Sequence, residues 1–175
     1  QIVIEAVAER LDIKQQVLQQ VAAQVDDKCI IATNTSSLSV SKIAEGIPNP
    51  ERVVGMHFFN PVRKMPLVEV MRGEHTSEET IIETAALAAR MGKTPVIVKD
   101  VAGFLVNRLL GPYLDEAMRL FVNGVSPSRI DKLMLKFGMP MGPLRLLDEV
   151  GLDIAMHASE SLEQAYGARM TPCPG

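Results

Sequence analysis

Two side chains that could carry out acid–base chemistry stand twelve residues apart in the segment HFFNPVRKMPLVEV, residues 57–70. His57 ends one apolar run, and Glu69 lies within the next. An imidazole suits the task of general base near neutral pH, because its ordinary pKa is about 6.5. The segment alone leaves open whether Glu69 takes part in such chemistry. It predicts either part of an active site or, in the simpler interpretation, two strands joined by a turn.

Further polar side chains follow three successive apolar runs in the first part of the chain. They are Glu5, Glu9 and Lys14 after the first run, Asn34, Thr35, Ser36 and Ser37 after the second, and His57 and Asn60 at the end of the third. In an open parallel sheet, ligands bind beyond the carboxyl ends of the strands. One polar strand end would indicate little, but three neighbouring ends, one with a histidine, favour a site.

The elements that would position these residues alternate between strands and helices. We expect strands over 2–7, 29–33, 53–58, 67–71 and 94–99, and helices over 10–25, 39–46 and 77–90. The strand segments are apolar throughout rather than alternating, which is typical of strands covered by helices on both faces. This order predicts an open, largely parallel α/β sheet.

After residue 101 no strand pattern remains. We expect a long helix over 102–122 with a kink at Pro112, a helix over 126–137, and two more helices over 143–166. The predicted fold class is therefore α/β, with part of a Rossmann-type parallel sheet in residues 1–100 and an all-helical domain in residues 101–175.

Composition narrows the class of protein. The formal net charge is −3 and no basic stripe occurs, which disfavours a nucleic-acid partner. No apolar run approaches the roughly 20 residues of a membrane span. Cys29 and Cys173 have the spacing of neither a metal site nor a disulfide framework, so we expect a reducing, cytoplasmic compartment and no metal.

Each polar residue also has a purely structural interpretation. His57 could be a buried histidine with a satisfied hydrogen bond, and residues 34–37 could cap the helix that follows them. Glu69 could be an ordinary strand carboxylate, and Asn107 a solvated residue on an apolar helix. Taken singly, these residues indicate no function.

Taken together, five stretches resemble the NAD-dependent L-3-hydroxyacyl-CoA dehydrogenase family. They are VIEAVAERLDIK, NTSSL, GMHFFNPVRKMPLVEV, GKTPVIVKDVAGFLVNRLL and MPMGPLRLLDEVGLD. The resemblance covers nearly the whole chain in the family's order. Within the family, RKMPLVEV and FGMPMGP are more similar to the dehydrogenase region of the alpha subunit of a multifunctional fatty-acid oxidation complex.

The resemblance implies roles for particular residues. His57 would be the general base for the 3-hydroxyl of the substrate, with Glu69 as its orienting partner. Ser36 and Asn107 would bind the substrate oxygen during hydride transfer. The residues implied in NAD binding are Val7, Ala8, Glu9, Lys14, Ser36 and Asn60. Because Asn107 belongs to the helical half, the substrate is expected between the two halves.

The chain also departs from the family pattern. Ala102 stands where the family usually has Pro. The glycine-rich turn that holds the NAD pyrophosphate and the acidic residue for the adenosine ribose are missing, and so is the family's closing motif after TPCPG. The expectation is a fragment that binds NAD weakly or not at all by itself.

Several alternatives stay open. The parent enzyme could act on 3-hydroxybutyryl-CoA, or the chain could serve as a non-catalytic dimerisation or interaction module. The resemblance implies a homodimer through the helical domain, a thiolase subunit as partner in the parent complex, and a bacterial cytosolic or mitochondrial matrix location.

Overall fold

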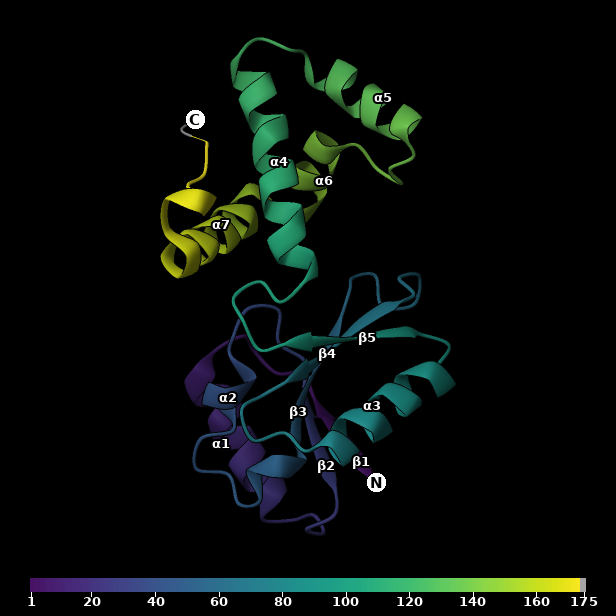
Figure 1. The fold of residues 1–175 in the computed structure, drawn as a ribbon, viewed down its shortest axis with the longest axis vertical. Coiled ribbons are helices and arrows are strands. Elements are labelled where there is room, and N and C mark those ends of the chain that lie inside the picture. Colours follow the sequence, from purple (N-terminus) through teal and green to yellow (C-terminus); the bar gives the residue numbers. More distant parts are fainter. Residues whose placement is uncertain (174–175) are drawn as a thin grey trace. The chain divides into compact units, whose positions relative to one another are not determined.

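The computed structural model describes residues 1–173 and divides into two compact units that meet in sequence at Leu105 and Val106. Residues 174 and 175, the end of the predicted helical domain, lie outside the described residues. The first unit is a sheet covered by helices and the second is helical, which confirms the predicted fold class (Figure 1). Within residues 1–173, no helix is both long and apolar enough to cross a bilayer.

The α/β unit is built on one five-stranded sheet with the order β1-β2-β3-β4-β5. In chain order its elements are β1 (Ile2–Glu5), α1 (Leu11–Ala22), β2 (Ile30–Thr33), α2 (Val40–Ile43), the 3-10 turn η1 (Pro50–Arg52), β3 (Val53–Phe58), β4 (Leu67–Arg72), α3 (Glu78–Arg90) and β5 (Thr94–Lys99). Each predicted strand and helix of this half is present, with ends that differ by a few residues. The first strand, for example, ends at Glu5 rather than at residue 7.

The direction of the strands changes once in the sheet. β1, β2 and β3 are parallel, whereas β4 runs antiparallel to β3 and parallel to β5. The connection between β3 and β4 covers only residues 59–66, and a parallel crossover needs a dozen or more residues. The chain must therefore turn back, and the amino end of β4 lies beside the carboxyl end of β3.

Alternating side chains of the same strands fill two separate cores. Ile31, Val53 and Met71 pack with Leu18 of α1 and with α2, whereas their neighbours Ile30, Val54 and Val70 pack under Ile81 of α3. Figure 1 shows α1 and α2 on one face of the sheet and α3 on the other. This arrangement explains the strand sequences that are apolar throughout, because both faces are buried.

The helical unit contains α4 (Val106–Val122), α5 (Pro127–Phe137), α6 (Pro143–Val150), α7 (Leu152–Tyr166) and the 3-10 turn η2 (Gly167–Met170). Its buried apolar side chains include Ala117, Ile130, Leu147 and Leu162. The Asp131 carboxylate of α5 accepts from the backbone nitrogens of Leu144 and Arg145 at 3.0 and 3.2 Å, which caps the start of α6.

The long helix α4 begins at Val106, four residues later than predicted. Gly103 and Phe104 have φ values of 69° and 43°, in the left-handed region that ends or precedes a right-handed helix. Pro112, where we expected a kink, lies inside α4, and the helix continues beyond it to Val122.

Candidate active site

His57 and Glu69 form a buried pair between adjacent strands. They are directly opposite each other in the antiparallel ladder of β3 and β4. His57 Nδ1 lies 2.8 Å from Glu69 Oε2, with side-chain exposures of 8% and 0%. A carboxylate only accepts, so Nδ1 carries the proton in this contact and the neutral ring keeps its lone pair on Nε2. That tautomer is the one a general base requires.

The second oxygen of Glu69 is held by a turn in the chain just before α4. The Leu105 backbone nitrogen donates to Glu69 Oε1 at 2.9 Å. The preceding residue, Phe104, is 2% exposed and adopts the left-handed φ of 43°, which is uncommon for a residue with a side chain. The backbone of residues 103–105 thus holds the Glu69 carboxylate in place through its second oxygen. No sequence signal indicated this contact, because the φ of Phe104 depends on its packing.

Aromatic rings surround the imidazole. The ring centroids of His57 and Phe59 are 4.5 Å apart, and those of His57 and Phe104 are 6.0 Å apart. These rings exclude water from one side of the imidazole. The electrostatic effect of Glu69 on the imidazolium is therefore stronger than it would be in solvent.

Glu9 and the turn after β2 form a second cluster. Five groups of three consecutive residues lie within hydrogen-bond distance of the single carboxylate oxygen Glu9 Oε1. They are Thr35 Oγ1 at 2.7 Å, the Ser36 nitrogen at 2.8 Å, the Ser37 nitrogen at 3.0 Å, Ser36 Oγ at 3.1 Å and Ser37 Oγ at 3.2 Å. The predicted cofactor residue Glu9 and the predicted substrate residue Ser36 are therefore in direct contact.

The pKa of Glu9 is lowered from its ordinary value of 4.5. Partial burial alone would raise this pKa, but the hydrogen bonds from Thr35, Ser36 and Ser37 and the nearby charge of Lys14 outweigh burial. The carboxylate is consequently ionised at neutral pH, where it accepts strongly from the turn.

Lys14 connects the ends of β1 and β2 from within the protein. Its ammonium group is fully buried, lies 2.9 Å from Glu5 Oε1 and 3.5 Å from Glu9 Oε2, and donates to the Asn34 carbonyl at 3.0 Å. Glu5 in turn accepts from Thr33 Oγ1 at 2.6 Å. A buried charge is tolerated only when it is paired and hydrogen-bonded, and Lys14 is both.

The other predicted cofactor residues lie in exposed backbone at the same edge of the sheet. Val7 and Ala8 follow β1, and Val7 is 40% exposed. Asn60 follows β3 and is also exposed. An exposed apolar side chain beside polar groups at the carboxyl ends of parallel strands fits a nucleotide. The remaining predicted residue, Asn107, is half-buried near the start of α4 in the helical unit.

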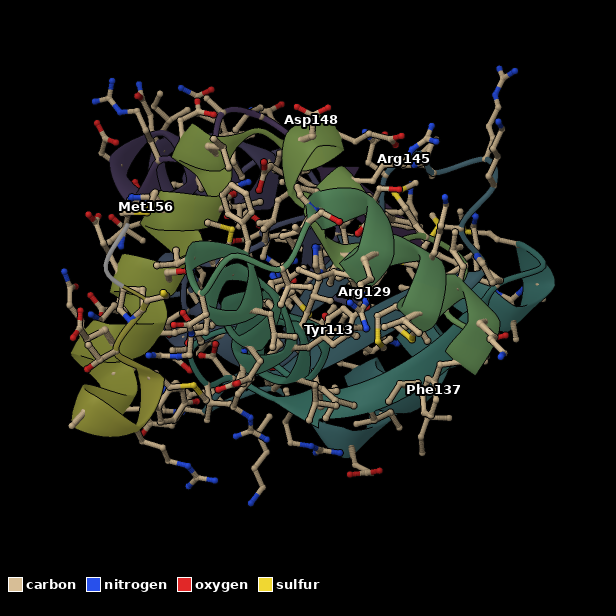
Figure 2. The ribbon with its side chains drawn as sticks, turned by 90° about the horizontal axis from the view of Figure 1, so that it is seen from above. Tyr113, Arg129, Phe137, Arg145, Asp148 and Met156 are labelled. Atoms are coloured by element: carbon tan, nitrogen blue, oxygen red, sulfur yellow. The ribbon has the colours of Figure 1, made fainter. Side chains whose placement is uncertain are left out.

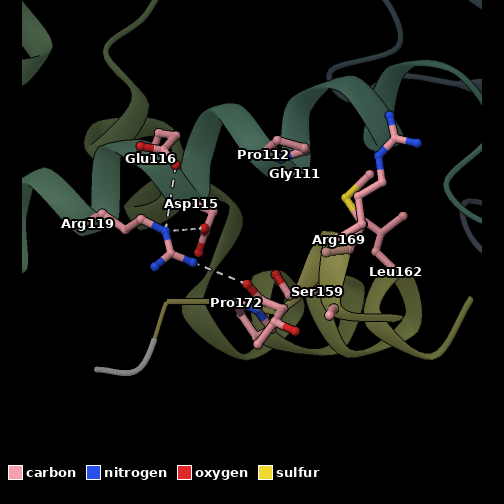
Figure 3. A pocket seen from close by; sticks show the side chains of 12 residues that line it. Gly111, Pro112, Asp115, Glu116, Arg119, Ser159, Leu162, Arg169 and Pro172 are labelled. Carbon is pink, nitrogen blue, oxygen red and sulfur yellow. Dashed lines mark hydrogen bonds and ion pairs between the residues drawn. The ribbon is translucent and has the colours of Figure 1, made fainter. Parts of the chain in front are cut away.

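The helical unit has a hollow of its own, about 380 Å³ in volume, between α4, α7 and the chain after η2 (Figure 3). Its charged lining residues are Asp115, Glu116, Arg119 and Arg169. The Arg119 guanidinium lies 2.8 Å from Asp115 Oδ2 and 3.7 Å from Glu116 Oε1, and it donates to the Thr171 carbonyl at 3.3 Å. These partners already engage the Arg119 cation, so its contacts are accounted for within the helical unit.

Comparison with protein families gives two adjacent matches. The model of the 3-hydroxyacyl-CoA dehydrogenase NAD binding domain matches residues 1–101, and that of the 3-hydroxyacyl-CoA dehydrogenase C-terminal domain matches residues 103–174. Among curated proteins, the chain is 52% identical over 171 residues to the fatty acid oxidation complex subunit alpha of Psychrobacter arcticus. That match covers 98% of this chain and 24% of the relative, so the chain spans about a quarter of the relative's length.

Solved structures of similar proteins share the fold. A 3-hydroxybutyryl-CoA dehydrogenase from Escherichia coli K12 is 40% identical with a TM-score of 0.92, and the match covers 98% of this chain and 37% of that one. An (S)-3-hydroxybutyryl-CoA dehydrogenase from Ralstonia eutropha is 42% identical with a TM-score of 0.92, over 98% of this chain and 62% of that one.

Proposed function

The chain belongs to the 3-hydroxyacyl-CoA dehydrogenase family, and from this membership we propose that the protein oxidises an L-3-hydroxyacyl-CoA to the 3-ketoacyl-CoA with NAD as cofactor. The observation that carries the proposal is the buried pair of His57 and Glu69, with Nδ1 and Oε2 at 2.8 Å. A histidine oriented in this way at the carboxyl end of a strand suits the removal of a hydroxyl proton.

In the proposed reaction, His57 Nε2 takes the proton from the 3-hydroxyl oxygen of the substrate. The O–H electrons form the new C3–O double bond, and the hydrogen on C3 leaves as hydride. NAD supplies the acceptor for that hydride. Glu69 stabilises the imidazolium that forms, because its carboxylate is fully buried and lies beside Nδ1. Ser36 holds the substrate oxygen in line for transfer, and we assign the same role to Asn107 of the helical unit.

The residues proposed to hold NAD are Val7, Ala8, Glu9, Lys14, Ser36 and Asn60. Their position beyond β1, β2 and β3 supports this assignment, since nucleotides bind at the carboxyl ends of parallel strands. That residues 1–175 by themselves bind NAD weakly or not at all stays a prediction, which calorimetric titration with NAD would test.

The test of the proposed function is turnover by the intact protein, followed as NADH formation with 3-hydroxyacyl-CoA substrates. We expect the His57→Gln variant to lose about 10²–10⁴-fold in kcat with little change in KM for the acyl-CoA. His75→Gln is the matched control, because His75 is an exposed histidine of the same unit outside the proposed site. A His57→Gln variant with the wild-type kcat would remove this residue from the mechanism.

A second candidate is activity on 3-hydroxybutyryl-CoA, which is favoured by the two solved relatives at 40% and 42% identity. A series of substrates of increasing acyl length separates the two proposals. If kcat/KM is highest for the four-carbon substrate, the second candidate holds; if longer chains are preferred, a fatty-acid oxidation function holds. The protein could also neither bind NAD nor turn over substrate, yet self-associate stably. That result would instead support the non-catalytic interaction module.

We also propose that the protein is cytosolic and assembles with partner subunits, a thiolase among them. The name of the Psychrobacter relative, which describes a subunit of a complex, supports this proposal. Copurification from the source cell would test it.

A further inference from the structure

We propose that Glu9 is a positioning residue for Ser36, which holds the turn after β2 in the geometry that hydride transfer requires. The inference deepens the proposed function and rests on it. It differs from a role for Glu9 as a cofactor contact alone, because here Glu9 acts through a second residue.

The first argument is the number of contacts on one atom. Glu9 Oε1 lies within 3.2 Å of five donor groups from Thr35, Ser36 and Ser37. A carboxylate oxygen has about two lone-pair sites, so five donors exceed what it can satisfy at once. The carboxylate therefore fixes the turn as a whole rather than one side chain.

The second argument concerns which of the five donor groups can leave Glu9 Oε1 for another acceptor. The closest are those of Thr35 Oγ1 and the Ser36 nitrogen, at 2.7 and 2.8 Å. The contact of Ser36 Oγ is longer, at 3.1 Å. The backbone of Ser36 is thus held firmly while its hydroxyl competes for the same oxygen. That hydroxyl can turn from Glu9 to a substrate oxygen without moving the chain.

The third argument is the support behind Glu9. The buried ammonium of Lys14 lies 3.5 Å from Glu9 Oε2 and donates to the Asn34 carbonyl, two residues before Ser36. Asn34 Oδ1 also accepts from the Phe58 nitrogen, next to His57, at 3.2 Å. One connected set of contacts therefore links Glu9, the turn and the strand that carries the base. Lys14 thus supports both Glu9 and the start of the turn from the interior of the protein.

The test is a double-mutant cycle in the intact protein, with kcat and the KM for NAD and for 3-hydroxyacyl-CoA measured separately. Glu9→Gln keeps the size of the side chain and removes its charge. We expect it to lower kcat about tenfold, because misplacement of a group in line with the reacting atoms is costly. In the Ser36→Ala background the same substitution should change kcat by less than about twofold, because the residue through which Glu9 acts is gone.

Three further variants guard against loss of folding. Thr35→Val removes the shortest of the five contacts, and Thr35→Ser keeps it, so the first should lower kcat and the second should restore it. Ser37→Ala removes a hydroxyl from the same carboxylate but leaves the Ser37 nitrogen in place, and its effect on kcat should be smaller in the Glu9→Gln background than in wild type.

The outcomes are distinct. Coupling between Glu9 and Ser36 in kcat supports the proposal, whether or not the KM for NAD also rises. Additive effects, or a rise in the KM for NAD with kcat unchanged, overturn it and leave Glu9 as a cofactor contact. A wild-type protein without dehydrogenase activity would instead contradict the proposed function.

Discussion

At the scale of single residues, the contact between His57 and Glu69 carries the proposed chemistry. We predict that Glu69→Gln keeps a hydrogen bond to Nδ1 but lowers kcat, because a neutral amide does not stabilise the imidazolium. Measurement of kcat for wild type and for the variant would test this prediction. A variant with the wild-type kcat would make Glu69 a strand residue only.

Glu9 leads to a prediction about stability rather than rate. Its pKa is lower in the folded protein than the ordinary 4.5, so the ionised carboxylate stabilises the fold at pH values above 4.5. This contribution is lost as the pH falls through the folded-state pKa. The difference in free energy of unfolding between wild type and Glu9→Gln should therefore be present at neutral pH and shrink in acid. Urea unfolding at several pH values measures it, and a difference that grows in acid would contradict the assignment.

At the scale of secondary structure, the packing of β3 leaves no room beside Gly55. A Cβ atom at this position would lie 2.5 Å from Met71 Cε, 2.7 Å from Val40 Cγ2 and 2.8 Å from Met71 Cβ. We predict that Gly55→Ala destabilises the α/β unit by about 1–3 kcal/mol, the usual effect of overpacking a core. Urea unfolding would measure the loss.

Gly111→Ala in α4 is the matched comparison. There a Cβ atom meets only Leu162 Cδ1, at 2.8 Å, which is the end of a flexible side chain. Alanine also favours a helix over glycine by up to about 1 kcal/mol. The variant should therefore be close to wild type in stability, and an equal loss at Gly55 and Gly111 would contradict the packing argument.

The secondary structure was predictable to the extent that it depends on local pattern. Apolar runs and helical spacing indicated each element of the α/β unit, and the polar strand ends indicated the site. The reversal of β4 follows from the short connection over residues 59–66. The residue pattern of β4 itself does not indicate whether the strand runs parallel or antiparallel to its neighbour. The left-handed backbone of Phe104 depends on tertiary packing, so the late start of α4 and the contact of Leu105 with Glu69 were beyond prediction.

The candidate site was likewise predictable where it depends on local sequence and not where it depends on tertiary packing. The residue types and the polar strand ends drew attention to His57, but its pairing with Glu69 and the roles of both were implied only by the resemblance to a family. The contacts of Glu9 with Ser36 could not be inferred, because the two residues are 27 positions apart and meet only when β1 and β2 are adjacent. Whether Asn107 contributes from the helical unit stays a prediction.

At the scale of the whole molecule, the helical unit exposes a number of large apolar side chains near the end of α4 and on α5. They are Leu120, Phe121, Val122, Leu133, Leu135 and Phe137, which are between 44% and 80% exposed, Phe137 most of all. Figure 2 labels Phe137, the last residue of α5. Apolar surface of this kind is usually covered by a partner when it is contiguous. We therefore predict a homodimer that uses the helical unit.

Sedimentation of wild type and of Phe137→Glu tests this prediction. The charged side chain should shift the protein toward monomer, because an unpaired charge in an apolar interface is costly. Ile82→Glu on α3, at a site 58% exposed in the other unit, is the matched control and should leave the assembly unchanged. A wild-type species of 19.1 kDa at micromolar concentration would contradict the dimer.

The direct opposition of His57 and Glu69 in the ladder has a consequence for how such a protein can diversify. The geometry of the pair is set by the hydrogen bonds between β3 and β4 and not by the chain that joins them. Residues 61–66, beyond Phe59 and Asn60, can therefore accept insertions, deletions or a grafted loop while the base and its partner stay in register. Substrate preference and chemistry can then evolve, or be engineered, as separate properties of adjoining segments.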